Sequence, residues 1–451
     1  MNNKRRELLL FFIIIFLGLL TSTVLGFLNG GFVDKGLISF NKIALSILHD
    51  FSFHDEDMLF PAFFRRPPGY PVVLSLSYLI FGERYFSVVV LNMILWLFGI
   101  TLFWRISRHF LRGYSALLPP LMLSLFWGAA TYVFSTNSDL FALFFTILFV
   151  WAFILYQEKK TTRWVFVQAL ALVFLTLTKP IILYALPVLV LLFILFNKPF
   201  SRRMLIGGIF CLLIIITLIG SWSLYSYRLL NTFQLSSGAL TLLRRADDVH
   251  MSPKRIQAFL LSSLVGDYVA DKVFPGYAND PEPVTKKTVE REKKYQALLA
   301  KDRSNDTEIQ RLAYKESLSL IRESPSKFFL LGFIYLIRIH MPVNHSGIDL
   351  SHLFVGTHNA FSEMQKTFLV IGIFLTWYVF IGISLAVLVR RLADWRKWGI
   401  IIFLVFYFVG VHAIISHSES RYLLPVMPFY FLAFSVFLSD FFFRRGLLTK
   451  V

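Results

Sequence analysis

Long apolar runs constrain the fold of this chain more than any other feature. Residues 8–28 form an unbroken apolar run, long enough to cross about 30 Å of hydrocarbon at a rise of 1.5 Å per residue. Similar runs recur along the chain, which is 56% hydrophobic with a mean hydropathy of +0.65. Only 16% of the residues are charged, against about 25% in an ordinary soluble protein. The sequence therefore predicts an all-α polytopic membrane protein.

The predicted spans are the apolar runs between charged clusters. They cover residues 8–28, 86–104, 115–134, 139–158, 164–178, 181–196, 204–225, 368–389, 398–415 and 422–443. A helix on the membrane surface is predicted at 35–48. The apolar stretch at 71–81, after a proline-rich loop, is predicted to be a helix end or a re-entrant piece, and 328–341, which contains Arg338, a partial or tilted helix. In total, about 10 to 12 transmembrane helices are expected.

Basic residues occur in short clusters between the apolar runs, beginning with residues 4–6. This is the pattern of cytoplasmic loops in membrane proteins, so both termini are predicted to be cytoplasmic and the loops 29–85 and 227–327 external. The net charge of +18 thus indicates membrane lipids as partners and no nucleic acid. The single cysteine, Cys211, excludes an intrachain disulfide.

Three parts follow from this topology. Residues 1–226 form an N-terminal transmembrane module that includes the first external loop, at 29–85. Residues 227–327 form a polar and mainly helical external segment. Residues 328–451 form a C-terminal transmembrane module. The polar segment is expected to bury little core alone and to pack on the membrane part.

Charged residues gather at the outer ends of the predicted spans. They are Asp34, Asp55, Glu56, Asp57, Arg65, Arg66, Asp139, Lys179, Arg228, Glu419 and Arg421. A charge near hydrocarbon costs a few kcal/mol unless it is paired or hydrated. Charges of both signs on one face therefore indicate a shared polar cavity rather than independent loop charges.

Several motifs carry a family resemblance. They are Arg65-Arg66-Pro67-Pro68-Gly69-Tyr70-Pro71 with a helix ending in Phe81-Gly82, Asp139 opening a span, Leu177-Thr178-Lys179-Pro180, the stretch 222–228, Glu323-Ser324-Pro325, and Ser420-Arg421-Tyr422-Leu423-Leu424-Pro425. In this order, they resemble the membrane-embedded GT-C glycosyltransferases of the protein O-mannosyltransferase and aminoarabinose transferase kind. The resemblance runs from about residue 8 to 440.

This resemblance implies an activity: transfer of a sugar from an undecaprenyl- or dolichyl-phosphate donor to a lipid, glycan or protein acceptor on the outer face, with inversion. Such transfer needs a carboxylate to take the acceptor proton and cations to hold the departing phosphate. The planar fork of Arg66 suits phosphate oxygens. Further donor-binding residues would come from a set of four: Arg65, Lys179, Arg228 and Arg421.

The catalytic carboxylate departs from the family pattern. Phe40 and Ala44 match the family's surface helix, but Gly36 stands where the acid is usual, and Asp34 lies two residues earlier. We expect Asp34 to be the base, with Asp55 or Asp57 as the alternative. Asp139 is expected to orient the base or to hold a divalent metal ion.

Two other functions remain open at this stage. A transporter or flippase for polyprenyl-linked glycans would favour ionisable residues inside the spans and a repeated half-structure, which the sequence lacks. A non-catalytic scaffold subunit would tolerate the displaced acid. The external histidines 340, 345, 352 and 358 fit no common zinc signature, so loop histidines are expected there.

Overall fold

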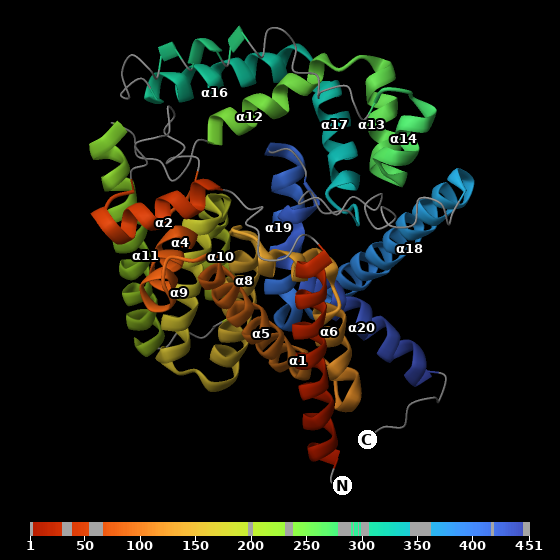
Figure 1. Ribbon diagram of the computed structural model, residues 1–451. Helices are drawn as coiled ribbons and strands as arrows, with labels where there is room; N and C mark the ends of the chain where they lie inside the picture. Colours follow the sequence, from red (N-terminus) through yellow and green to blue (C-terminus); the bar gives the residue numbers. More distant parts are fainter. Residues whose placement is uncertain are drawn as a thin grey trace.

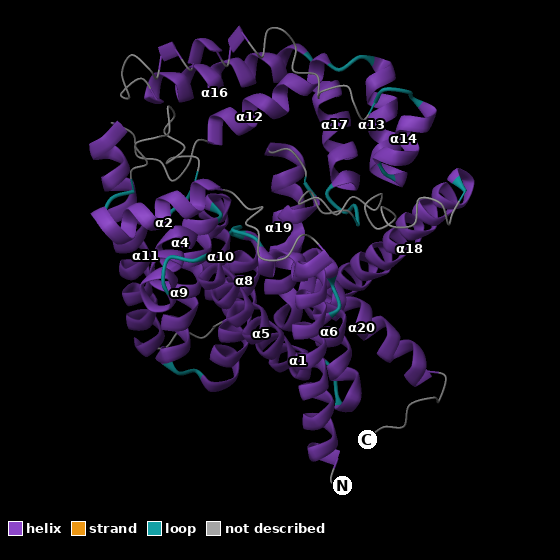
Figure 2. Cartoon of the chain, in the orientation of Figure 1, coloured by secondary structure: helices purple, strands orange, loops and turns teal. Residues whose placement is uncertain are grey.

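The structure is a computed structural model. It describes residues 3–28, 38–53, 66–196, 202–230, 238–277, 290–291, 293–295, 297–298, 306–342, 362–415 and 419–444. Within these residues the ordered elements are helices, and Figure 2 draws no strand among them. The predicted all-α class is confirmed.

The long helices follow the predicted spans in order. They are α1 (Asn3–Leu28), α5 (Tyr85–Phe110), α8 (Asp139–Lys159), α9 (Thr162–Thr178), η3 (Pro180–Ala185) with α10 (Leu186–Phe196), α11 (Arg202–Leu230), α18 (Glu363–Arg390), α19 (Trp395–Ile415), and η8 (Ser420–Val426) with α20 (Met427–Arg444). Six helical segments of the described chain are long and apolar enough to cross a membrane, the longest of them containing both α18 and α19. The chain is therefore a multi-pass membrane protein.

The predicted span at 115–134 is not one straight helix. It consists of η1 (Gly113–Leu117), α6 (Leu118–Ser124), α7 (Trp127–Ala130) and η2 (Thr131–Phe134), and its halves are bent by 52°. The break falls at Phe126, whose backbone is extended. The Phe126 ring stacks on Trp377 at 5.8 Å between centroids, and this contact across the bundle accompanies the bend. Apolar periodicity alone could not reveal it.

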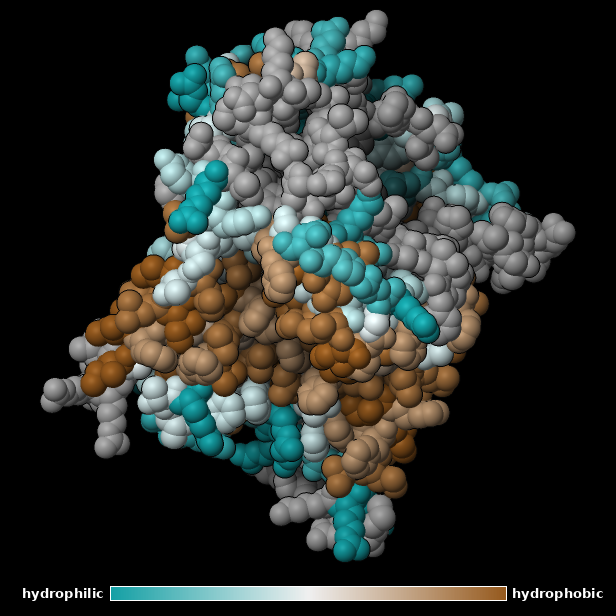
Figure 3. Space-filling view, turned by 60° about the vertical axis from the view of Figure 1, so that its left-hand side comes forward, coloured by the Kyte–Doolittle hydropathy of each residue, from teal (hydrophilic) through white to brown (hydrophobic). Residues whose placement is uncertain are grey.

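Ion pairs join neighbouring helices at one end of the helix bundle. At one end, Arg108 near the end of α5 pairs with Glu7 of α1 at 3.5 Å, and His109 contacts Glu158 of α8 at 2.9 Å. Figure 1 shows the start of α1 and the end of α20 at this lower end. Figure 3 shows a broad hydrophobic band between hydrophilic surfaces above and below. The band has the character of a surface that lies against lipid.

A polar cap covers the opposite end of the bundle (Figure 1). We define the cap as α12 (Gly238–Asp247), η4 (Asp248–His250), α13 (Pro253–Val265), α14 (Asp267–Val273), α16 (Asp306–Glu323), α17 (Pro325–Arg338) and the described residues of 290–298. Within the cap, α12 and α16, together with Phe328 of α17, enclose a buried apolar cluster that includes Leu243 and Ile309. Both helices are amphipathic, so facing each other buries one stripe of each.

The cap also packs on the membrane part, as expected. The Tyr378 hydroxyl of α18 donates a hydrogen bond to the backbone oxygen of Ser263 in α13. The ring of Phe374 in α18 lies against Gly266, where an added Cβ would come within 3.0 Å of it. The division of the chain at residues 226 and 327 stays a prediction.

Candidate active site

The first part of the site is a buried ion pair between the ends of two helices. Asp139 begins α8, and its side chain is only 1% exposed. Its Oδ1 accepts a hydrogen bond from the Nζ of Lys179, which directly follows α9 and is 15% exposed. Helices α8 and α9 pack against each other, so the start of one lies beside the end of the other. This antiparallel packing brings two residues together that are 40 positions apart.

A second ion pair comes from the start of the last span. Arg421 forms an ion pair with Glu419, between Nε and Oε2, and the two side chains are 21% and 23% exposed. Element η8, which contains Arg421, packs on α8. Asp139 acts electrostatically on Arg421 together with Glu419. The two ion pairs therefore belong to one charged cluster.

An aromatic residue joins the two cations. Lys179 Nζ lies 5.6 Å from the centre of the Tyr422 ring, and the Arg421 guanidinium carbon lies 5.5 Å from it. His412 of α19 stacks on the same ring, with centroids 4.6 Å apart. A cation within about 6 Å of an aromatic face is attracted to it. Tyr422 thus holds both cations near one place. The sequence did not predict this role, although Tyr422 belongs to the motif that begins at Ser420.

The proline-rich turn reaches the same end of the bundle. Gly69 begins α4 (Gly69–Phe81) and touches the end of α9, where an added Cβ would lie 2.5 Å from Thr178 Oγ1 and 3.0 Å from the Leu177 backbone. Only glycine allows this approach. Arg66 is three residues earlier, and its guanidinium lies 5.1 Å from the ring of Phe40 in α2 (Ile38–Asp50). The turn therefore brings the start of α4, three residues after Arg66, against the end of α9 that precedes Lys179.

The remaining predicted site residues fall into two groups. Arg228 is exposed in the last turn of α11, and no described interaction joins it to the charged cluster. Five predicted residues lie outside the described residues: Asp34, Asp55, Glu56, Asp57 and Arg65.

Of the four external histidines, only His340 is described. Its Nε2 lies 2.8 Å from the Tyr430 hydroxyl and its Nδ1 lies 2.7 Å from the Leu336 oxygen. Burial lowers the pKa of His340 to about 4. The described residues contain no group of three His, Cys, Asp or Glu side chains able to hold a metal ion.

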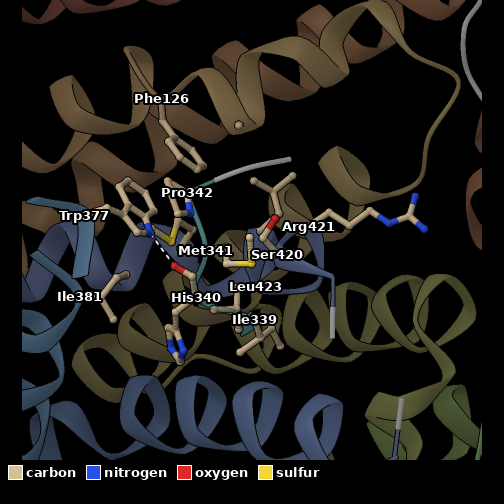
Figure 4. A pocket seen from close by; sticks show the side chains of 13 residues that line it. Phe126, Ile339, His340, Met341, Pro342, Trp377, Ile381, Ser420, Arg421 and Leu423 are labelled. Carbon is tan, nitrogen blue, oxygen red and sulfur yellow. Dashed lines mark hydrogen bonds between the residues drawn. The ribbon is translucent and has the colours of Figure 1, made fainter. Parts of the chain in front are cut away.

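A pocket of about 370 Å³, including its open mouth, adjoins the charged cluster. Its walls include Phe126, Trp377 and Ser420, and Trp377 donates to the His340 backbone oxygen at 2.7 Å. Figure 4 shows the Arg421 side chain leaving this pocket, with its guanidinium turned away from Trp377. The terminal nitrogens of Arg421 therefore point away from the aromatic wall of the pocket.

A comparison with known families finds a match over part of the chain. The model of the dolichyl-phosphate-mannose-protein mannosyltransferase family matches residues 65–222, which contain Arg66, Asp139 and Lys179. The match confirms the resemblance to GT-C membrane glycosyltransferases. It covers a little over a third of the chain, from the proline-rich turn to the middle of α11. No curated protein matches the chain.

The solved structures that are similar to this chain include two proteins. The oligosaccharyltransferase AglB from Archaeoglobus fulgidus, solved with an inhibitory peptide and a dolichol-phosphate, has a TM-score of 0.42 and 12% identity, over 97% of this chain and 51% of that one. ArnT from Cupriavidus metallidurans has a TM-score of 0.40 and 15% identity, over 96% of this chain and 78% of that one. The chain thus spans about half the length of AglB.

Proposed function

We propose that this chain is an inverting membrane glycosyltransferase of the GT-C type. It moves a sugar from an undecaprenyl- or dolichyl-phosphate donor to a lipid, glycan or protein acceptor at the outer face of the membrane. The observation that carries the proposal is the charged cluster of Asp139, Lys179, Glu419 and Arg421, which lies beside the Arg66 turn at one end of membrane-spanning helices.

The geometry suits the release of a lipid phosphate. As the bond to C1 of the sugar breaks, negative charge develops on the phosphate, and prearranged cations stabilise it. The ion pairs hold Lys179 and Arg421 in place before a donor arrives. Arg421 contacts Glu419 through Nε, and no carboxylate among the described residues pairs with its terminal nitrogens, which suit phosphate oxygens. Arg66 completes the set as a second planar fork.

The acceptor proton requires a carboxylate that is accessible to substrate. Asp139 is almost fully buried and bound by Lys179, so it supports a positioning role. We therefore keep Asp34 as the proposed base and Asp55 or Asp57 as its alternatives. Asp34→Asn should lower transfer about 10²-fold or more, with donor binding unchanged. Full activity of Asp34→Asn together with an inactive Asp55→Asn or Asp57→Asn would move the base to the loop.

Binding of a divalent metal ion is the other role that we expect for Asp139. Because this side chain is bound by Lys179, a metal here would need additional ligands from Asp34, Asp55 or Asp57. Transfer lost in EDTA and restored by added Mn²⁺ or Mg²⁺ is the result expected of such a site. Transfer that persists in EDTA would leave Asp139 with its positioning role alone.

The decisive experiment measures sugar transfer by the purified full chain in liposomes, from radiolabelled polyprenyl-phosphate sugars to extracted envelope acceptors. Wild type should release polyprenyl phosphate and glycosylate an acceptor. Arg66→Ala should abolish transfer, and Arg66→Lys should recover only part of it, because a point charge replaces a fork. Absence of transfer from every donor by a folded wild type would refute the proposal.

The outer-face location is tested by cysteine labelling in intact cells, on a Cys211→Ala background. The cap should be external and the termini cytoplasmic. An impermeant maleimide should therefore label Lys254→Cys, exposed on α13, and leave Asp394→Cys, exposed between α18 and α19, unlabelled. The reverse pattern would place the charged cluster on the cytoplasmic face.

A further inference from the structure

A pocket lies between α18 and α20 at the end of the bundle opposite the cap, where Figure 1 shows the end of α20. Its volume is about 790 Å³, including its open side. Pockets of about 300 to 1,000 Å³ commonly hold small ligands. The lining comes from the end of α18, the start of η7 (Arg391–Asp394) and one face of α20, and it consists of Val387, Arg390, Arg391, Phe437, Asp440 and Phe441. None of these residues belongs to the charged cluster of the candidate active site.

Helical spacing makes this pocket apolar inside and charged at its mouth. On α18, Val387 is followed three and four residues later by the two arginines of the lining. On α20, Phe437 is followed at the same spacing by Asp440 and Phe441. Residues three and four apart share one face of a helix, so each apolar residue lies one turn deeper than the charges.

The apolar wall continues onto the outside of the bundle. Val387 is 9% exposed, whereas Phe441 is 38% exposed. The rings of Phe437 and Phe441 stack with centroids 6.1 Å apart, so they form one aromatic surface along α20. An acyl chain on this surface would pass from the pocket into the surrounding hydrocarbon without leaving apolar contact.

The mouth of the pocket has a net positive charge. Arg390 is exposed, and among the described residues no carboxylate pairs with it. Arg391 contacts Asp440 through one nitrogen, Nη2, at 2.8 Å. Two arginines and one aspartate leave a net charge of +1. A phosphodiester group with its single negative charge complements this site, and the planar fork of an arginine suits phosphate oxygens.

The backbone at the mouth does not attract an anion by itself. Helix α18 ends at Arg390, and the carbonyls at a helix C-terminus carry partial negative charge. Binding of an anion therefore depends on the two arginine side chains. Basic residues at this position also stabilise the helix end and mark cytoplasmic loops, but neither role needs an apolar pocket beside them.

Helix α18 places the pocket on the far side of the membrane from the cap. Its first residue, Glu363, pairs with Lys272 of the cap at 3.0 Å, and its last residue, Arg390, lines the pocket. A helix of 28 residues is about 42 Å long. This length crosses about 30 Å of hydrocarbon even when the helix is tilted. The mouth therefore lies near the headgroups of the leaflet opposite the cap.

We propose that this pocket binds one anionic phospholipid of the leaflet opposite the cap. The phosphate lies between Arg390 and Arg391, and an acyl chain lies along Phe441 and Phe437. Basic pockets between transmembrane helices on the cytoplasmic side hold lipid headgroups in this way. The site is separate from the charged cluster, and the proposal does not rest on the proposed function.

Two double variants form a matched pair. Arg390→Gln with Arg391→Gln removes two charges from the mouth of the pocket. Arg105→Gln with Arg163→Gln removes two exposed charges from the same end of the bundle, outside the pocket. Exposed charges contribute little to stability, so both double variants should fold. Asp440→Asn changes the pocket in the opposite direction, because it removes the carboxylate that competes with a phosphate for Arg391.

The binding test titrates the full chain in neutral detergent with phosphatidylglycerol or with phosphatidylcholine, and native mass spectrometry measures the bound lipid. Wild type should bind one phosphatidylglycerol about fivefold more tightly than phosphatidylcholine, and the pocket double variant should weaken this binding about 25-fold, since each basic residue near anionic lipid contributes a factor of about five. The control double variant should match wild type. Equal affinity for the two lipids, or equal binding by the two double variants, overturns the proposal.

A second comparison distinguishes a lipid from a free phosphate. Glycerophosphoglycerol, which is the headgroup without acyl chains, should not displace phosphatidylglycerol even in large excess, because it lacks the chain that the apolar wall binds. Displacement would assign the pocket to a soluble phosphate and overturn the lipid.

Two further measurements separate lost binding from lost structure. Phosphatidylglycerol should raise the unfolding temperature of wild type and of the control double variant, but not that of the pocket double variant. Asp440→Asn should bind the lipid about fivefold more tightly than wild type, a gain that damage to the fold does not produce. Unchanged or weaker binding by Asp440→Asn contradicts the placement of the phosphate, whatever the stability of the arginine variants.

Discussion

The cap and the candidate site each hold an arginine against carboxylates, but the accessible part of the arginine side chain differs between the two regions. Arg245 in the cap has no exposed surface: its guanidinium lies 4.5 Å from the rings of both Phe328 and Tyr335, and Nη2 donates to the Phe328 oxygen. Arg421 at the site is 21% exposed, and the carboxylate that pairs with it among the described residues, Glu419, contacts its Nε. The same type of side chain therefore serves packing in the cap and leaves a surface for a ligand at the candidate site.

A second cap arginine strengthens the contrast. Arg291 contacts Asp247 with Nη1 and Glu316 with Nη2, both at 2.7 Å. Its terminal nitrogens are therefore occupied by the protein. The corresponding nitrogens of Arg421 are the ones that Figure 4 shows turned away from the aromatic pocket. Terminal nitrogens paired with carboxylates indicate a structural arginine, and terminal nitrogens without a carboxylate partner among the described residues favour a binding arginine.

The largest expected effect is on the stability of the cap. Arg245→Met should lower the free energy of unfolding by about 3 to 5 kcal/mol, because Asp248, 3.6 Å from Arg245, is left buried without its cation. Denaturation in mixed micelles measures the loss. The double variant Arg245→Met with Asp248→Asn should recover much of it. Transfer per folded molecule should stay at the wild-type level, and a fall in turnover without a fall in stability would contradict the comparison.

Arg421→Ala should show the opposite pattern. Transfer should fall about 10²- to 10³-fold, the usual effect of removing one donor to a developing anion. The unfolding midpoint should move little, since Glu419 is partly exposed and can be hydrated. Arg421→Lys should restore part of the rate. A destabilised Arg421→Ala with normal turnover would make this arginine structural, like Arg245.

The junction between the two regions should respond to pH. His340 follows α17 of the cap and contacts Tyr430 of the bundle. Its folded pKa of about 4 lies below the ordinary value of 6.5, so unfolding takes up a proton between these values. The contribution of His340 to stability is complete above pH 6.5 and is lost as pH falls towards 4. Between pH 7 and pH 5, wild type should lose about 2 kcal/mol that His340→Gln does not lose. Equal losses in both proteins would contradict the assignment.

Much of the fold could be predicted because membrane spans depend on local composition. The apolar runs and their basic flanks located α1, α5, α8 and α11 with small errors at the ends. The bend at Phe126 escaped prediction because it accompanies a contact with Trp377, far away in the sequence. The apolar cluster of the cap escaped for a similar reason, since it forms only when α12 meets α16.

The candidate site was predicted as a set of residues but not as a geometry. Asp139, Lys179 and Arg421 could be selected because charges at the ends of spans are costly. The pairing of Asp139 with Lys179 depends on how α8 and α9 pack, which spacing alone does not determine. Tyr422 and His412 carried no charge signal, since an aromatic ring and a histidine near the end of a span are common. Their roles become visible only through the distances to Lys179 and Arg421.

The smallest expected effect tests whether a half-exposed cap carboxylate matters at all. Glu316 is 37% exposed and pairs with Arg291. When Glu316 is replaced, Arg291 still has its more buried partner, Asp247. Glu316→Gln should therefore change the free energy of unfolding by less than about 1 kcal/mol, as expected of a solvent-screened pair. Transfer should be unchanged, because Arg291 lies in the cap and not in the charged cluster.

Asp247→Asn is the matched comparison, because it removes the more buried partner of Arg291. It should lower the free energy of unfolding by more than Glu316→Gln does, so the two variants together rank the cap carboxylates by burial. A larger loss in Glu316→Gln than in Asp247→Asn would reverse that ranking and show that exposure does not decide the role of these charges.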